Sequence, residues 1–133
     1  MTYAQLVAYL EAQALEAGAA TFWHGKKTAL DINYNAAFPQ AHLFLVPSTL
    51  RAGRVVHRLN LCFYGKDTHE SSEAEVVAIQ DAMDRLTQQF VGLLEEDGQG
   101  MLSDVERAPT VRQGAQIGTG YFISFTFSTL ALC

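Results

Sequence analysis

Residues 72–96, SEAEVVAIQDAMDRLTQQFVGLLEE, predict a long amphipathic helix around which the rest of the chain is organised. Ser72 and Glu75 have the spacing of a capping box at its start, and Gly98 is placed to end it with a positive φ. Apolar residues recur at intervals of three and four, which places them on one helix face: Val76, Ile79, Met83, Leu86, Phe90 and Leu93.

The same spacing fits two structures, a helix laid across a sheet and a coiled coil. We favour the helix across a sheet, because the sequence contains no second helix of this kind. A shorter helix is predicted over residues 2–17, with Thr2 and Gln5 as a capping pair and Gly18 as its end.

The other segments have the patterns of strands and turns. The cleanest strands are residues 55–65 and 121–130, which alternate apolar and polar side chains. Residues 41–46 form a continuous apolar run, typical of a strand covered on both faces. Further strands are predicted at residues 20–24, 30–35 and 101–108, the last stopped by Pro109, with a loop or hairpin turn at 50–54 and a flexible loop at 110–120.

These elements predict one α+β domain spanning residues 1–133. The expected architecture is a two-layer sandwich, with an antiparallel or mixed sheet of about four to six strands, an N-terminal helix and one long central helix. A doubly wound parallel fold is disfavoured, because only one helix lies between strands.

Composition narrows the function classes. Hydrophobic residues make up 49% of the chain and charged residues 17%, which suggests that a partner covers part of its surface. The net charge of −5 argues against a general nucleic-acid binder, which needs a basic surface. We expect no membrane span and no signal peptide, because no apolar run approaches the roughly 20 residues that a span needs.

The sequence contains no motif that indicates catalysis, a cofactor or a metal. Cys62 and Cys133 lack metal or redox spacing and are interpreted as one buried and one exposed thiol in a reducing compartment. The acidic segment 67–70 lacks the order of a calcium loop, and the glycines of residues 114–120 precede a strand rather than a helix. The histidines are dispersed, at His24, His42, His57 and His69, without the spacing of a metal site. His42 and His57 lie within predicted strands and are interpreted as structural.

Arg107, Arg112 and Gln113 flank Pro109 in ERAPTVRQG. Two interpretations stay open for them. They are ordinary residues of a solvated loop, or they form a polar arm that reaches a neighbouring subunit, since arginine is favoured at interfaces and the loop is long for a hairpin.

Three segments together carry a resemblance to a known family: TYAQLVAYLEA at the start, HRLNLCFYGKD running into SSEAEVVAIQDAMDRL, and the closing VERAPTVRQGAQIGTGYFISFTFS. The layout resembles the small tail terminator and tail-completion (neck) proteins of long-tailed bacteriophages and their relatives in phage-derived injection particles. The closing strand, polar loop and aromatic-serine strand are the most family-like part.

The resemblance implies a non-enzymatic subunit without cofactor or metal, assembled in the bacterial cytoplasm into a virion or tail-like particle. It implies a ring of copies, commonly a hexamer, that contacts tail tube or connector proteins, without specific nucleic-acid or membrane binding but with possible DNA passage through its lumen. Candidate contact residues lie in the loops 66–71 and 110–120 and beside them: Asp67, His69, Glu70, Arg107, Arg112, Gln113 and Gln116.

Two alternatives remain from the residues alone. The first is a small enzyme or ligand-binding α+β domain with a cleft beside the sheet that contains His57, Asp67 or His69. The second is an adaptor that binds another protein through a sheet edge.

Overall fold

The computed structural model describes residues 1–25, 37–67, 71–111 and 118–131 and confirms an α+β fold. These residues form two helices and a six-stranded mixed open sheet. The elements in chain order are α1 (Tyr3–Ala17), β1 (Thr21–Gly25), β2 (Gln40–Phe44), β3 (Ser48–Arg51), β4 (Arg54–Tyr64), α2 (Glu73–Asp97), β5 (Met101–Thr110) and β6 (Gly120–Leu130).

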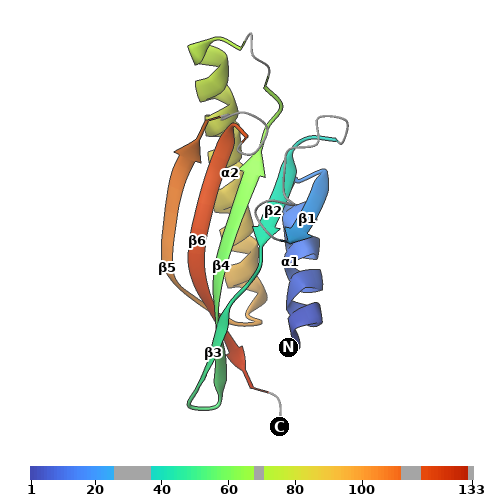
Figure 1. The fold of residues 1–133 in the computed structure, drawn as a ribbon, viewed down its shortest axis with the longest axis vertical. Coiled ribbons are helices and arrows are strands. Elements are labelled where there is room, and N and C mark those ends of the chain that lie inside the picture. Colours follow the sequence, from blue (N-terminus) through green and yellow to red (C-terminus); the bar gives the residue numbers. More distant parts are fainter. Residues whose placement is uncertain (26–36, 68–70, 112–117, 132–133) are drawn as a thin grey trace.

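The sheet is built around the pair β4–β6, which stays in register along the full length of both strands (Figure 1). The strand order is β1-β2-β4-β6-β5. The other edge of β4 is shared, with β3 on residues 54–57 and β2 on residues 61–64. Only the β1–β2 pair among these is parallel. In the described residues, β1 and β5 are the outer strands.

Helix α1 begins and ends as its sequence predicts. Thr2 accepts a hydrogen bond from the backbone of Gln5, whose side chain bonds back to Thr2, and Gly18 with φ 131° ends the helix. One face is buried against α2 and β1 through Leu6, Leu10, Ala14 and Ala17.

Helix α2 lies across the sheet, in contact with β4, β5 and β6, as expected (Figure 1). Ser72 caps it, accepting a hydrogen bond from the Glu75 amide, and Gly98 ends it in the left-handed conformation. The predicted apolar face is shifted at its end, because Leu94 is fully buried whereas Leu93 is only partly buried. A 3.6-residue repeat reaches position 94 after Phe90 as readily as position 93.

The core lies between α2 and one face of β4 and β6. Alternate residues of both strands are fully buried there: Leu59, Leu61, Phe63, Ile123, Phe125 and Phe127. Phe90 of α2 sits between two of these rings, with centroids 5.5 Å from Phe63 and 6.4 Å from Phe125. The aromatic rings therefore join the helix to the two central strands.

The opposite face of the sheet, called the outer face here, is also partly buried. Cys62 and Tyr64 pack there with Phe38, Phe44 and Phe122. In β2 both faces are covered, as the apolar run predicts, because Ala41 and Leu43 join the core while His42 is buried on the outer face. Cys62 is a buried thiol as expected, and Cys133 lies outside the described residues.

One sequence prediction about strands is wrong. Pro109 does not stop β5, which continues to Thr110 and pairs Pro109 with Tyr121. Proline is tolerated there because β5 is an outer strand, where a missing N–H costs no ladder bond. The predicted loop or hairpin turn at 50–54 is a hairpin turn at Ala52 and Gly53, preceded by the additional strand β3. The predicted strand at 30–35 lies outside the described residues.

Replacing Phe90 by alanine tests whether α2 is held by the aromatic core. We expect Phe90→Ala to lower the free energy of unfolding by about 3–5 kcal/mol, because it removes a fully buried ring and leaves a cavity. Val77 is exposed on the same helix, so Val77→Ala is the control and should change the free energy of unfolding by less than about 0.5 kcal/mol. Chemical denaturation measures both, and equal effects would contradict the assignment of the core.

Candidate functional site

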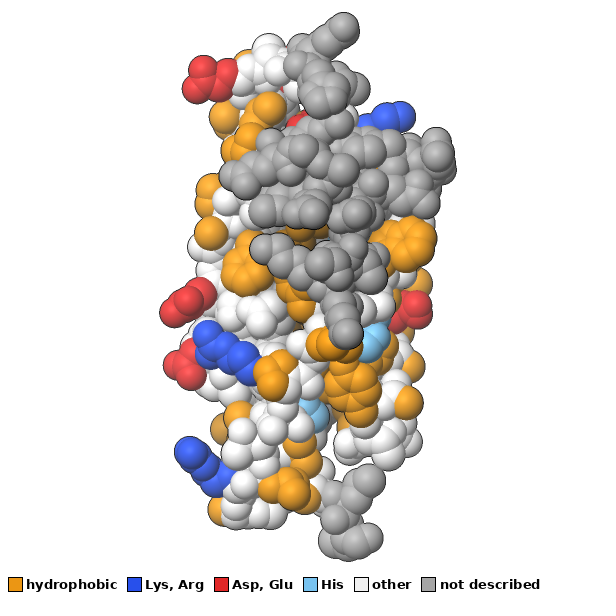
Figure 2. Space-filling model, viewed as in Figure 1, with side chains coloured by type: hydrophobic (Ala, Val, Ile, Leu, Met, Phe, Trp, Pro, Cys, Tyr) orange, Lys and Arg blue, Asp and Glu red, His pale blue; other side chains and the backbone are white. Residues whose placement is uncertain are grey.

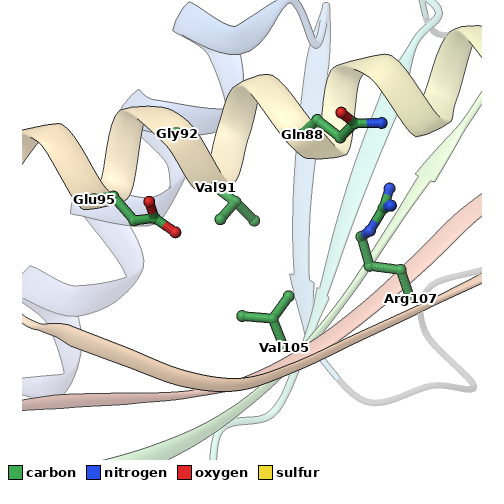
Figure 3. A pocket seen from close by; sticks show the side chains of 6 residues that line it. All are labelled: Gln88, Val91, Gly92, Glu95, Val105 and Arg107. Carbon is green, nitrogen blue, oxygen red and sulfur yellow. The ribbon is translucent and has the colours of Figure 1, made fainter.

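A shallow groove runs between α2 and the outer strand β5, and we call it the α2–β5 groove (Figure 3). It has a volume of about 250 Å³. Val91 and Val105 face each other across it, with Glu95 near one end and Arg107 near the other. Its lining is Gln88, Val91, Gly92 and Glu95 from α2, and Val105 and Arg107 from β5.

A β-bulge in β5 shapes one wall of the groove. Ser103 pairs with Thr126 and Glu106 with Ser124, so Asp104 and Val105 together oppose a single residue of β6. Asp104 has a φ of 54°, a left-handed conformation that aspartate tolerates better than most residues. The bulge interrupts the regular ladder, and bulges of this kind discourage further pairing at a sheet edge. Contact through the groove is therefore better supported than addition of a strand to β5.

Arg107 forms the polar end of the groove and binds α2. It forms an ion pair with Asp84, donates a hydrogen bond of 3.4 Å to the Thr87 hydroxyl, and lies 5.4 Å from the centre of the Tyr121 ring. Arg107 belongs to β5, as the strand predicted at 101–108 implies, and not to the solvated loop or arm also considered for it. Its side chain is 32% exposed. Arg107 therefore ties β5 to α2, and a contact with another subunit stays a prediction.

The charge of Asp84 is stabilised by this arrangement. A hydrogen bond from Gln88, together with Arg107 and Arg85, holds the pKa of the Asp84 carboxyl below its usual value, against a smaller opposing effect of burial. Because the folded-state pKa is lowered, this stabilisation is present above the pKa of an unfolded aspartate. It is lost as the pH falls through the folded-state pKa.

Comparing two arginines of the chain tests the Arg107–Asp84 pair. At neutral pH we expect Arg107→Met to lower the free energy of unfolding by about 1 kcal/mol, because the partly buried pair and the contact with Tyr121 are lost. Arg85→Met, which removes the exposed pair with Asp81, should cost roughly 0.3 kcal/mol or less. Denaturant titrations measure both, and the difference between the variants should shrink in acid, once Asp84 is protonated, to the part that the Tyr121 and Thr87 contacts contribute.

The loop residues predicted as contacts are largely beyond the described residues. His69, Glu70, Arg112, Gln113 and Gln116 all lie there. Asp67 is described, and it is 5% exposed and accepts a hydrogen bond from the Thr119 hydroxyl. Since Thr119 also accepts a 3.0 Å hydrogen bond from the Gly65 amide, Asp67 helps to hold the two loops of its own chain together.

A second feature is the β3–β4 hairpin, residues 48–57, which projects beyond both helices at one end of the sheet (Figure 1). Ala52 and Gly53 form its tip with φ of 51° and 77°, as a type I′ turn requires. The Gly53 carbonyl accepts a 2.8 Å hydrogen bond from the Ala131 amide, which attaches the tip to the end of β6. All four residues of β3 are exposed, and Leu50 is 74% exposed.

The outer face near the hairpin is basic. Arg54 donates hydrogen bonds of 2.7 Å and 2.9 Å to the hydroxyl and carbonyl of Ser128, and Arg58 lies within 3.5 Å of the Thr126 hydroxyl. Figure 2, which views this face, shows two groups of basic side chains in the lower half of the molecule and acidic side chains at both edges. The hairpin thus combines an exposed apolar side chain with positive charge.

His57, at the base of the hairpin, is buried on the helix side of the sheet. Neither of its ring nitrogens has a hydrogen-bond partner in the described part of the chain, and it is 3% exposed. Burial, and secondarily the positive Met1 amino terminus, lower the pKa of His57 below its usual value. The predicted structural role agrees with this burial, and His57 does not line the α2–β5 groove.

The His57 pKa predicts an acid-sensitive fold. As the pH falls, His57 is protonated in the unfolded chain before it is protonated in the folded chain, because its pKa is lower in the fold. The free energy of unfolding should therefore be unaffected at pH values above the usual histidine pKa near 6.5. At lower pH it should decrease, by at most about 1.4 kcal/mol per pH unit. His57→Leu should remove this component, whereas the exposed His24→Leu should retain it. Unfolding free energies measured between mildly acidic and neutral pH check this, and an unchanged slope in His57→Leu would contradict it.

Other classes of site are not supported by the described residues. They contain no group of three or more His, Cys, Asp or Glu side chains arranged to hold a metal ion. None of the helices described is long and apolar enough to cross a membrane. The chain matches no protein-family model, and it matches no curated protein sequence.

Sequence reasoning named one residue of the α2–β5 groove, Arg107, and missed the others. Gly92 was the available signal, because a glycine within a long helix is costly unless something needs the space. For the hairpin, the signal was Leu50, an isolated large apolar residue in an otherwise polar turn. Neither residue indicates where the groove or the hairpin lies in the folded structure.

Proposed function

We propose that this protein is a non-enzymatic structural subunit of a phage tail or phage-tail-like particle. Copies of the chain form a closed ring, commonly a hexamer, that terminates or completes the tail tube and joins it to a connector component. The proposal rests on the resemblance carried by the central strand, the capped helix and the closing aromatic-serine strand.

One observation supports assembly above the others: the exposed β3–β4 hairpin, which projects from the fold with Leu50 uncovered. An extended hairpin with little cover from its own chain gains stability when another chain packs on it. A ring needs two different contact surfaces on each subunit, and the hairpin and the α2–β5 groove provide such a pair.

The finer architecture belongs to the same proposal. Contacts of α2 with β4, β5 and β6, and of α1 with α2 and β1, support a two-layer sandwich in which both helices form the second layer. The net charge of −5 suits a ring through which DNA passes, because a lumen of the same sign as DNA does not retain it.

The alternative of a small enzyme or ligand-binding domain has weaker support. Its expected cleft contains His57, Asp67 or His69. His57 and Asp67 are buried in the fold and do not line the α2–β5 groove, and His69 lies outside the described residues. The groove is also smaller than the roughly 300–1,000 Å³ of most small-molecule sites.

Mass measurement of the purified protein over a wide concentration range tests the proposal. We expect a discrete closed oligomer, visible as rings by electron microscopy, and the protein itself detectable in purified tail particles. Genes for tail tube, sheath or portal proteins should flank its gene. A strictly monomeric protein at high concentration that is missing from particles would refute the ring.

A further inference from the structure

We propose that the β3–β4 hairpin of one copy inserts into the α2–β5 groove of the next copy, with Leu50 between the two valines and the hairpin arginines beside the acidic end of α2. This contact rests on the proposed ring and specifies which surfaces form it. The occupant of the groove is therefore a second copy of this chain.

The hairpin presents an apolar anchor on a rigid support. Leu50 lies opposite Val55 in the hairpin register, on the side that faces the helices elsewhere in the sheet. Because the hairpin projects beyond α1 and α2, this side is uncovered and Leu50 is exposed (Figure 1). The bonds of Arg54 to Ser128 and of Ala131 to Gly53 fix the hairpin before it binds, which reduces the entropy cost of docking.

The groove has a size and a lining that suit such an anchor. Its walls are Val91 and Val105, which face each other, and its volume of about 250 Å³ exceeds the about 150 Å³ that can hold a benzene ring. One leucine side chain and part of its strand therefore fit, whereas most small-molecule ligands do not.

Gly92 contributes a position without a side chain to the α2 wall of the groove. It lies in the interior of α2, and a Cβ built there meets no atom within 4 Å. Glycine costs about 1 kcal/mol relative to alanine in a helix, and no contact of the described chain requires it. Close approach of another chain at this position is a physical reason for the missing side chain.

The charges of the two surfaces are complementary. The hairpin tip carries Arg51 and Arg54 and no acidic residue, and neither arginine forms an ion pair in the described part of the chain. The two arginines pair with each other on the face of the hairpin opposite Leu50, so they reach the acidic end of α2 with their long side chains from beside the groove rather than from within it. The end of α2 carries Glu95, Glu96 and Asp97 and no basic residue in its last turn. Negative charge at a helix C-terminus is unfavourable, so a cation from another copy is stabilising there.

Filling the groove with a larger side chain tests whether the hairpin of another copy docks there, without removing a contact of the core. Gly92→Leu adds a side chain at a position where a Cβ meets no atom of its own chain within 4 Å. Because leucine favours a helix more than glycine does, the variant should unfold no more easily than the wild type. We expect it to be monomeric where the wild type is oligomeric, as measured by light scattering. Leu50→Asp should have the same effect, and Leu15→Asp, at an exposed leucine of α1, is its control and should still assemble.

Mixing two variants tests the head-to-tail geometry. Leu50→Asp keeps an intact groove and Gly92→Leu keeps an intact hairpin, so one contact remains between them. We expect the mixture to form 1:1 heterodimers and nothing larger, whereas each variant alone stays monomeric.

Charge reversal tests the ionic part. Arg51→Glu and Glu95→Arg should each weaken assembly by at least tenfold, and the double variant should recover most of the loss. Glu16→Arg, at an exposed acidic residue of α1, is the matched control and should have no effect.

The outcomes separate this contact from the ring itself. If the wild type forms rings and Gly92→Leu and Leu50→Asp form them equally well, the hairpin does not occupy the groove and the ring proposal stands. If the wild type is monomeric under all conditions and missing from particles, both proposals are wrong.

Discussion

The fold depends on the aromatic contact between α2 and the β4–β6 pair, where Phe90 packs between Phe63 and Phe125. After β4 the chain forms α2, which packs across the sheet through this contact. It then forms β5 and β6, and β6 pairs with β4. This arrangement requires close packing: a Cβ on Gly120 would lie 1.9 Å from the Phe63 carbonyl oxygen, and one on Gly100 would lie 2.5 Å from the Phe127 ring. The packing of α2 on the β4–β6 pair therefore depends on both glycines as well as on the aromatic rings.

Sequence reasoning succeeded where structure follows from local periodicity. The caps and buried faces of α1 and α2, and the core faces of β4 and β6, follow from spacings of 3.6 and 2 residues together with Thr2, Ser72 and the terminal glycines. It failed where the outcome depends on pairing between distant segments. Pro109 stays within a strand only because β5 is an outer strand, and no local signal gives that position.

The α2–β5 groove could not be derived for the same reason. Arg107 was recognised as a candidate, but its partner Asp84 lies 23 residues earlier in the chain, on α2. The sequence alone does not specify which face of α2 is turned toward β5. The bulge that shapes the facing wall depends on a left-handed Asp104 where no glycine marks it. The hairpin was partly visible, since Gly53 indicates a turn, but its projection beyond the helices depends on where both helices end.

The distribution of charge bears on the symmetry of any assembly. A two-fold contact between hairpins would bring Arg51 and Arg54 of one copy against the same residues of the other, and a two-fold contact between grooves would do so for Glu95. Both arrangements place like charges together, whereas any contact that pairs the hairpin with the groove joins opposite charges, and in a ring this contact repeats at every interface. Such a contact closes into a ring only if its angle is constant. Hydrogen bonds from Arg54 to Ser128 and from Ala131 to Gly53 attach the hairpin to the end of β6, which favours a constant angle.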